Sequence, residues 1–231
     1  MKLHLSPKNI AFIIALLVIV GGLGYGYWQS RPQVDQIVLQ RDVEMEPAIR
    51  QTFVQRIELT KAALAAQEAS GGKVEMALYI NLASDYVMIG ELKQGADVYK
   101  HYVTNVNQID YTAWNNYGDV AEQMGDYLVA EQAYLKAIEL LPDYEEYNRD
   151  YVEFLQNHFA ASRGQDIREA LENAVTNVGQ TNWTMVNLAK WYLADGDCDQ
   201  ALAHYKVALQ LSPDNTALQD EYAEAKDQCK K

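Results

Sequence analysis

The sequence predicts an all-α protein in which an N-terminal transmembrane helix precedes a solenoid of about four helix-turn-helix repeats and a capping helix. Two observations lead to this prediction. Residues 9–30 carry no charged side chain. A pattern of aromatic, small and chain-breaking residues at 111–144 recurs at constant offsets before and after it. Recurrence with a period of roughly 34 residues is typical of stacked helix pairs.

Charge is distributed unevenly along the chain. Lys2, Lys8 and Arg31 are the only charged residues up to position 31, so all 32 acidic residues lie after it. The remainder therefore has 16 basic residues, which is 19 less these three, against 32 acidic ones, a formal charge of −16. This balance argues against nucleic acid as a partner, because proteins that bind nucleic acid concentrate positive charge.

Residues 9–30 form the predicted signal-anchor helix. A helix of 22 residues rises about 33 Å, enough to cross a hydrocarbon layer of about 30 Å. Lys2 and Lys8 place the tail at residues 1–8 in the cytoplasm by the positive-inside rule, and hence the repeats outside the cytoplasm. Aromatic residues suited to the interface stand at the far end of the span, namely Tyr25, Tyr27 and Trp28. We therefore expect a single-pass protein of the cell membrane that contacts the lipid bilayer through this helix.

A cleaved signal peptide is the alternative for the same segment. The apolar run from Ile10 to Val20 is short, and small residues follow it at 22–26. No A-x-A-like cleavage site comes after them, which favours an uncleaved anchor. Gly22 and Gly26 have the spacing found where membrane helices pack, so a homodimer through this helix is a further hypothesis.

Two segments connect the span to the repeats. Residues 31–46 are polar and predicted to be a linker. Pro47 then opens a helix predicted over 47–71, with two glutamates near its positive end. Its apolar residues lie close to one face, so we expect it to pack on the first repeat. These residues are Ile49, Phe53, Ile57, Ala62 and Leu64.

The unit at 111–144 follows the physics of two packed antiparallel helices. Small residues are needed where the helices cross about 8–10 Å apart, and large residues one turn away fill the remaining space. A glycine can end the first helix in the left-handed conformation, and a proline stops the second. The residues in these roles are Trp114, Tyr117, Gly118, Gly125, Ala130, Tyr134, Ala137 and Pro142. Their spacing resembles that of the tetratricopeptide repeat family.

Constant offsets locate the other units. An offset of +71 gives Leu188, Ala189, Gly196, Ala201, Tyr205, Ala208 and Pro213, with Tyr192 at the position of Ala121. An offset of −35 gives Tyr79, Leu82, Ala83, Gly90, Gly95 and Tyr99. Because 71 exceeds two periods by a few residues, one irregular unit must lie between the unit at 111–144 and its copy 71 residues later. This unit is predicted to have a longer turn at 162–166, followed by its second helix at 167–178. The solenoid is therefore predicted over 76–214. Residues 215–231 form a capping helix with Leu218 and Tyr222 on one side.

The family resemblance implies that the chain binds a protein or peptide. The first helices of such repeats line a concave groove that holds an extended or helical segment. Repeat geometry places in it Ile80, Ser84, Val87, Met88, Thr112, Asn115, Asp119, Glu122, Arg149, Glu153, Gln156, Trp183, Val186 and Lys190. We expect a membrane-anchored scaffold that assembles other envelope proteins. The alternative is an assembly factor of a cytochrome c maturation type system, whose repeat subunits are similar in layout.

The sequence predicts no catalytic site, no metal site and no cofactor. Four separate histidines, without the spacing of zinc ligands, are His4, His101, His158 and His204. The spacing of the first calcium ligands is also present, at Asp195, Asp197 and Asp199. A calcium loop needs glycine at its sixth position and glutamate at its twelfth, whereas here the glycine is the second residue, Gly196, and the twelfth is Lys206. No nucleophile elbow, phosphate-binding loop or dinucleotide glycine motif is present.

Cys198 and Cys229 are predicted to form a disulfide. Cys198 begins the second helix of the last repeat, Cys229 ends the capping helix, and these two helices are consecutive and antiparallel. Fifteen residues separate Cys198 from Pro213 and 14 separate Asn215 from Cys229, so equal helical rises bring both cysteines to one level. An exported domain meets an oxidising environment in which such a bond persists. The alternative is two unrelated thiols.

Overall fold

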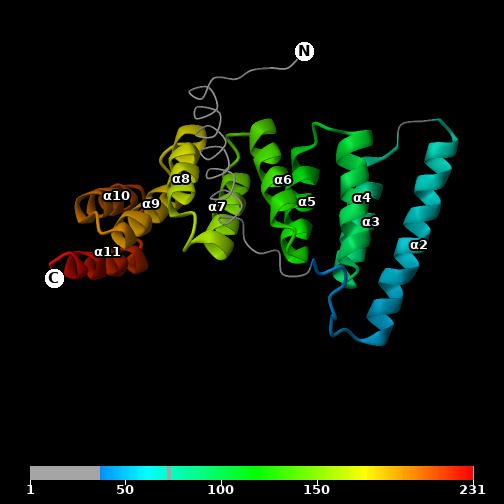
Figure 1. Cartoon of the computed structure of the whole chain (residues 1–231), viewed down its shortest axis with the longest axis horizontal. Helices are drawn as coiled ribbons and strands as arrows, with labels where there is room; N and C mark the ends of the chain where they lie inside the picture. The colour runs from blue at the N-terminus through cyan, green and yellow to red at the C-terminus, as the bar shows by residue number, and fades with distance from the viewer. Residues whose placement is uncertain (1–36, 72–73, 231) are drawn as a thin grey trace, which may run out of the picture. The chain divides into compact units, whose positions relative to one another are not determined.

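The computed structural model describes residues 37–71 and 74–230. This part of the chain is an array of ten helices, so the all-α prediction is confirmed for it. The helices are α2 (Pro47–Ala69), α3 (Met76–Met88), α4 (Leu92–His101), α5 (Tyr111–Met124), α6 (Tyr127–Leu140), α7 (Glu145–Phe159), α8 (Gly164–Val178), α9 (Asn182–Asp195), α10 (Cys198–Leu211) and α11 (Thr216–Gln228), and the π-helical turn η1 (Tyr102–Val106) continues α4. Each helix packs on its neighbours in chain order (Figure 1).

The described residues belong to one compact unit, Gln36–Lys231. The predicted tail at 1–8 and the predicted anchor at 9–30 lie outside the described residues. Among the helices that the structure describes, none combines the length and the apolar character needed to cross a membrane.

Helices α9 and α10 repeat α5 and α6 at an offset of 71 residues at all four helix ends. Gly125 ends α5 with a φ of +76° and Gly196 ends α9 with a φ of +86°. The aspartates that follow them, Asp126 and Asp197, accept hydrogen bonds from backbone amides of the next helix. The same residue types thus form the same turn twice, because both units need a left-handed end and a capped start.

Small residues let the paired helices approach each other. Ala130 and Ala137 are 0% exposed, and a Cβ atom added at Gly118 would lie 2.8 Å from the ring of Tyr134. The corresponding Ala201 and Ala208 are also fully buried. Of the other predicted packing residues, Tyr117, Tyr134, Leu188, Ala189 and Tyr205 are buried, Trp114 and Tyr192 are half-buried, and Pro142 and Pro213 are exposed just after α6 and α10.

The turn η1 explains why the first repeat is one residue longer than a period of about 34. The amide of Asn107 donates to the carbonyl oxygen of Tyr102 at 2.9 Å, a π-type bond across five residues that accommodates one extra residue. The buried hydroxyl of Tyr102 then donates to Asp110 at 2.9 Å, and Asp110 caps α5 by accepting from the amide of Ala113 at 3.0 Å. The inserted turn therefore holds the start of the next repeat.

The irregular unit consists of α7 and α8, and its internal turn is shorter than the sequence predicts. Helix α8 begins at Gly164 rather than at 167. Arg163 fixes this start, because it donates to Asp166 at 2.5 Å and to Glu131 of α6 at 2.6 Å. Asp166 also lies in the first turn of α8, where a negative charge favours the helix.

Helix α2 packs on α3, as predicted, and does so through three of the five predicted apolar residues. Ile57, Thr60 and Leu64 are buried and Phe53 is half-buried, whereas Ile49 and Ala62 are exposed. The buried positions follow the spacing of three and four residues that defines one side of a helix, and position 62 lies well away from that side. At this interface Arg56 forms a bidentate ion pair with Asp85 of α3, which is 2% exposed.

Residues 37–43, the N-terminal strap, lie within the predicted linker at 31–46 and form neither helix nor strand. They pass across the turns of the first two repeats. Backbone hydrogen bonds of 2.8 to 2.9 Å attach the strap: Val38 N to Met124 O, Arg41 N to Gly90 O, and Lys93 N to Leu39 O. The described part of this segment is thus bound to the repeats.

Gly90→Ala is expected to destabilise the array more than Gly196→Ala. Both glycines have a φ of +86°, so alanine meets the same backbone strain at each, about 1–2 kcal/mol. A Cβ atom at Gly90 would lie 2.0 Å from the carbonyl oxygen of Arg41, whereas nothing lies within 4 Å at Gly196. Gly90→Ala therefore also displaces the strap and costs about 1 kcal/mol more for each hydrogen bond lost. Urea denaturation and amide exchange at Arg41 measure this; equal losses with a protected Arg41 amide would contradict it.

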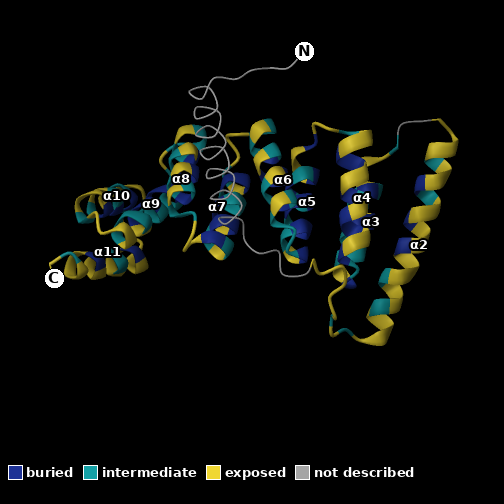
Figure 2. Cartoon of the chain, viewed as in Figure 1, coloured by how far each residue is buried: buried dark blue, intermediate teal, exposed yellow. Residues whose placement is uncertain are grey.

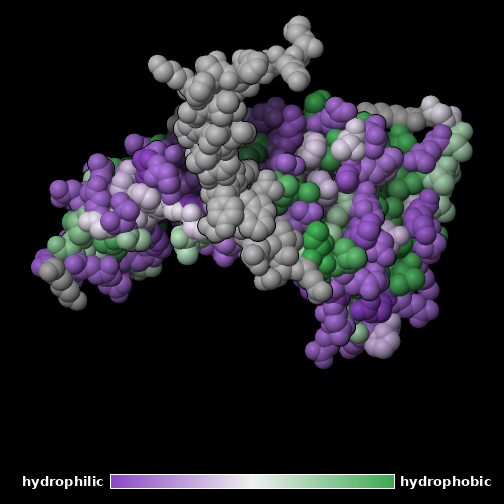
Figure 3. Space-filling view, in the orientation of Figure 1, coloured by the Kyte–Doolittle hydropathy of each residue, from purple (hydrophilic) through white to green (hydrophobic). Residues whose placement is uncertain are grey.

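Cys198 and Cys229 form a disulfide between α10 and α11, with their Cα atoms 5.7 Å apart. Helix α11 buries only Leu218 and Ala225 in full. Buried residues elsewhere follow the helix interfaces through the array (Figure 2). Hydrophilic side chains predominate on the visible face, with hydrophobic ones interspersed over the earlier helices (Figure 3).

Candidate functional site

The first helices of the repeats, α3, α5, α7 and α9, carry the residues that repeat geometry assigns to the groove. We call these residues the first-helix face. Between α5 and α7, side chains about one repeat apart meet directly. The Oγ1 atom of Thr112 lies 3.0 Å from the hydroxyl of Tyr147, the Nδ2 atom of Asn115 donates to Asp150 at 2.7 Å, and Glu122 Oε1 lies 2.8 Å from His158 Nε2. The structure thus brings the predicted α5 residues together with three unpredicted residues of α7.

Three carboxyl groups define an acidic cluster between these helices: Asp119, Glu122 and Asp150. The hydroxyl of Tyr134 from α6 lies 2.8 Å from Asp119 and 2.6 Å from Glu122. A hydroxyl has a single proton to donate, so the two carboxyl groups compete for it unless one of them carries a proton. Tyr134 therefore both fills the helix crossing and orients the cluster.

Burial raises the pKa of Asp119 to about 6, opposed by the hydrogen bond from Tyr134 and reinforced by the charges of Asp150 and Glu122. Burial is also the main reason why the pKa of Asp150 is raised, and its hydrogen bond from Asn115 opposes this. Burial and the neighbouring carboxylates raise the pKa of Tyr134, so it stays protonated at neutral pH. At neutral pH the cluster consequently concentrates negative charge at a partly desolvated position.

Asp119→Asn is expected to stabilise the array at pH 7 by about 1–2 kcal/mol, because the amide removes a partly buried charge. The raised pKa means that the folded state binds the Asp119 proton more tightly than the unfolded state does. The penalty is therefore present above the folded pKa of about 6 and disappears as pH falls towards the ordinary value of 3.8. Urea denaturation of both proteins from pH 7.5 to pH 4 measures the difference. A difference that stays constant with pH would contradict this assignment.

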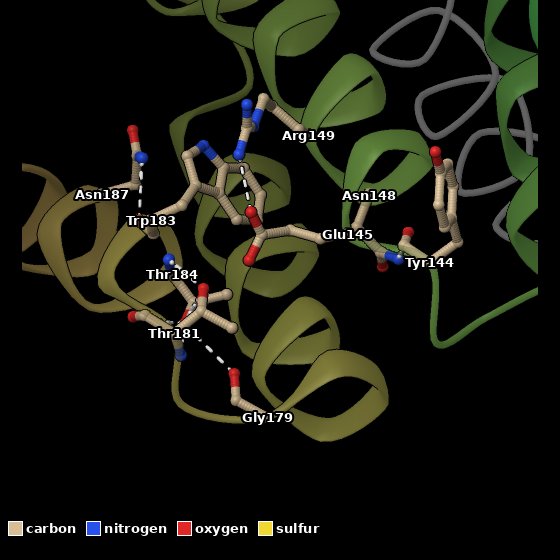
Figure 4. A network of polar contacts seen from close by, with 9 residues as sticks. All are labelled: Tyr144, Glu145, Asn148, Arg149, Gly179, Thr181, Trp183, Thr184 and Asn187. Atoms are coloured by element: carbon tan, nitrogen blue, oxygen red, sulfur yellow. Dashed lines mark hydrogen bonds and ion pairs between the residues drawn. The ribbon is translucent and has the colours of Figure 1, made fainter. Parts of the chain in front are cut away.

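Farther along, α7 and α9 line an open, shallow pocket of about 590 Å³. It is lined by Glu145, Arg149 and Glu153 of α7 and by Thr181, Asn182, Trp183, Val186 and Asn187 at the start of α9. The guanidinium of Arg149 lies over the Trp183 ring, 5.5 Å from its centroid, and donates to Glu145 at 2.6 Å (Figure 4). Four predicted groove residues therefore line one pocket: Arg149, Glu153, Trp183 and Val186.

The start of α9 fixes the position of Trp183. Thr181 and Thr184 form a reciprocal capping box, and the hydroxyl of Thr184 lies 3.1 Å from the carbonyl oxygen of Gly179 (Figure 4). Asn187 donates to the carbonyl oxygen of Trp183 at 2.9 Å. These bonds satisfy the backbone groups at the helix start and so hold the indole against α7.

The remaining predicted groove residues contribute less polar surface. Ile80 and Val87 are half-buried against the core of the first repeats, and Ser84 is 3.1 Å from the hydroxyl of Tyr99. Lys190 forms an ion pair of 3.0 Å with Glu221 of α11. Met88 is exposed and Gln156 is half-buried. The polar and charged groups of the first-helix face thus lie mainly on α5, α7 and α9.

Sequence reasoning missed Tyr147 and Asp150, although an offset of 35 residues from Thr112 and Asn115 leads to them. That offset was available from the first two units. It also missed the hydrogen bonds of the Tyr134 hydroxyl to Asp119 and Glu122. Packing at the helix crossing was already a sufficient reason for a tyrosine at this position. Within the described ranges, no group of three His, Cys, Asp or Glu side chains is placed to hold a metal ion.

Comparison with known proteins agrees with this geometry. Residues 111–144 match the family model described as tetratricopeptide repeat. None of the curated proteins that were compared matches the chain.

Several solved structures are similar to this chain. A crystal structure of MamA has 17% sequence identity and a TM-score of 0.56, with 74% of this chain and 88% of that chain covered. A MamA fragment from Desulfovibrio magneticus RS-1 has 17% identity and a TM-score of 0.51, with 67% and 86% covered. The C-terminal part of a TPR repeat-containing protein from Cytophaga hutchinsonii has 15% identity and a TM-score of 0.59, with 76% and 67% covered. At these identities the likeness shows the fold, a tetratricopeptide-type helical array.

Proposed function

We propose that this chain, which contains a tetratricopeptide repeat and folds as arrays of such repeats do, is a membrane-anchored scaffold that binds a protein or peptide on its first-helix face. The observation that carries the proposal is that buried packing residues and surface polar residues occupy different positions in each repeat. The small and aromatic repeat residues are mostly buried between helices, whereas the first helices α5, α7 and α9 present charged groups and a pocket of about 590 Å³. Polar residues that no packing requirement explains are the ones most simply assigned to binding.

The location is part of the same proposal. Residues 9–30 anchor the chain in the cell membrane, the N-terminus faces the cytoplasm, and the array lies outside it. The charge-free stretch and the lysines before it support this orientation, and so does a cysteine pair suited to an oxidising compartment. A reporter fused after Lys231 that is active only outside the cytoplasm is the expected result. Activity in the cytoplasm would reverse the orientation.

Site-specific photo-crosslinking tests the binding face. A photoreactive residue at Glu153, which is exposed and lines the pocket, is expected to capture a protein partner in cells of the native host. The matched control is Glu169, which is equally a glutamate and exposed but belongs to α8, a second helix. Capture from position 169 with none from position 153 would place the binding surface elsewhere and refute the proposal.

A further inference from the structure

The acidic cluster has no strong cationic partner within the described part of the chain. Asp119 and Asp150 accept hydrogen bonds from Tyr134 and Asn115, both neutral groups, and form no ion pair there. Glu122 is paired only with His158, which is charged only when protonated. By contrast, Glu131 and Glu145 on the neighbouring helices α6 and α7 each have an arginine. The charge of Arg149 acts on Asp150, but its guanidinium is bonded to Glu145. Within the described part of the chain, Asp119 and Asp150 therefore have no cation bonded to them to offset their repulsion.

Asn115 adds a second, independent observation at the same place. Its side chain is directed at Asp150, and the residue is only 6% exposed. Its Nδ2 atom donates to Asp150, but its Oδ1 atom is buried without any hydrogen-bond donor. A buried carbonyl oxygen without a hydrogen-bond donor is destabilising, because it has lost its hydrogen bond to water. Asp119 and Asp150 thus lack a bonded cation, and this amide oxygen lacks a hydrogen-bond donor.

The shape of the cluster determines what kind of donor fits. In the described ranges no three acidic, histidine or cysteine side chains converge on a point where a metal ion would bind. The negative groups instead continue along α7 from Asp150 to the exposed Glu153 at the edge of the pocket. Such a row suits an extended ligand with several separate ammonium or guanidinium groups. These groups carry only donors and form the strongest hydrogen bonds with carboxylates.

We propose that the partner segment bound on the first-helix face is a basic one, whose lysine or arginine side chains are received by Asp119, Glu122 and Asp150. This inference rests on the proposed function and specifies the chemistry of its partner. The formal charge of −16 after Arg31 acts in the same direction, because it attracts a basic segment over a longer range.

Selection of phage-displayed random 12-residue peptides on the full chain in detergent micelles tests the inference. The peptides recovered are expected to be enriched in lysine and arginine. One recovered peptide is then synthesised, and its affinity is measured for Asp119→Asn/Asp150→Asn, in which both side chains keep their shape and lose their charge. The matched control, Asp143→Asn/Asp214→Asn, makes the same charge change at two exposed aspartates in the turns after α6 and α10.

Binding is expected to weaken about tenfold or more in the cluster variant and less than about twofold in the control. Binding to the unsubstituted chain is also expected to weaken as salt is raised, which tests the charge contribution even if a variant fails to fold. Recovery of neutral or acidic peptides, or equal affinities for the two variants, would overturn the basic-partner inference. The proposed function would survive that result if those peptides crosslink at Glu153. Recovery of no peptide, or crosslinking only outside the first-helix face, would count against the proposed function itself.

Discussion

Replacing both Cys198 and Cys229 with serine is expected to lower the free energy of unfolding by about 3–4 kcal/mol. The bond closes a loop with a sequence separation of 31 residues, and the chain-entropy model gives this cost for the freedom that the unfolded chain regains. The effect is expected to concentrate in α11. That helix buries only Leu218 and Ala225 in full and is the last helix of the described array, so it has few other interactions to keep it in place.

Urea denaturation and hydrogen exchange of α11 measure this effect. Reducing agent is expected to reproduce the loss in the unsubstituted protein and to leave the double serine variant unchanged, which separates the bond from the substitutions. Both cysteines are half-buried, so serine adds little further cost. Two free thiols found by non-reducing mass spectrometry of protein purified from the membrane would refute the bond and weaken the proposal that the array lies outside the cytoplasm.

Ala137→Leu is expected to destabilise the array by about 3 kcal/mol through overpacking. Ala137 is 0% exposed, one turn after the buried Tyr134, so the added carbon atoms have no empty volume to enter. The helices must move apart, or side chains must leave their preferred rotamers. Ala208→Leu, at the equivalent position of the last repeat, is expected to have a similar cost.

Thermal and urea denaturation check this prediction. The matched control is Ala203→Leu, which makes the same substitution at an exposed position of α10 and is expected to change stability by less than about 0.5 kcal/mol. If Ala137→Leu melts as the control does, the two helices of this repeat do not pack closely around Ala137.

The two proposals about binding depend on a distinction between two kinds of position in the repeat, those that pack the helices together and those on the surface of the first helices. Packing fixes the small and aromatic positions, and this leaves the first helices free to vary in chemistry. In this chain, positions of α5 and α7 away from the helix crossings carry carboxylates whose neighbours provide hydrogen-bond donors but hardly any positive charge. The partner's chemistry is therefore inferred from the part of the repeat that the fold does not constrain.

The residue pattern predicted an all-α helical array, its two regular units and the turns inside them, and the structure confirms these for the part of the chain that it describes. The four ends of α5 and α6 map onto the four ends of α9 and α10 at an offset of 71. Glycine, aspartate and alanine at fixed spacing impose local constraints that any stacked helix pair must satisfy. The prediction that Cys198 and Cys229 lie side by side depended on the regular geometry of helices in the same way, since the rise per residue of a helix is constant.

Features that depend on contacts between distant segments could not be predicted from the sequence. The strap at 37–43 belongs to a segment predicted to be a polar linker. Backbone hydrogen bonds at Gly90 and Met124 attach it, together with side-chain bonds from Gln40 and Arg41, and a sequence pattern does not reveal backbone contacts of this kind. The pairs Thr112 with Tyr147 and Asn115 with Asp150 depend on how one repeat is rotated against the next. That rotation arises from the packing of whole helices, so the shared environment of Asp119, Glu122 and Asp150 emerges only when the repeats are stacked.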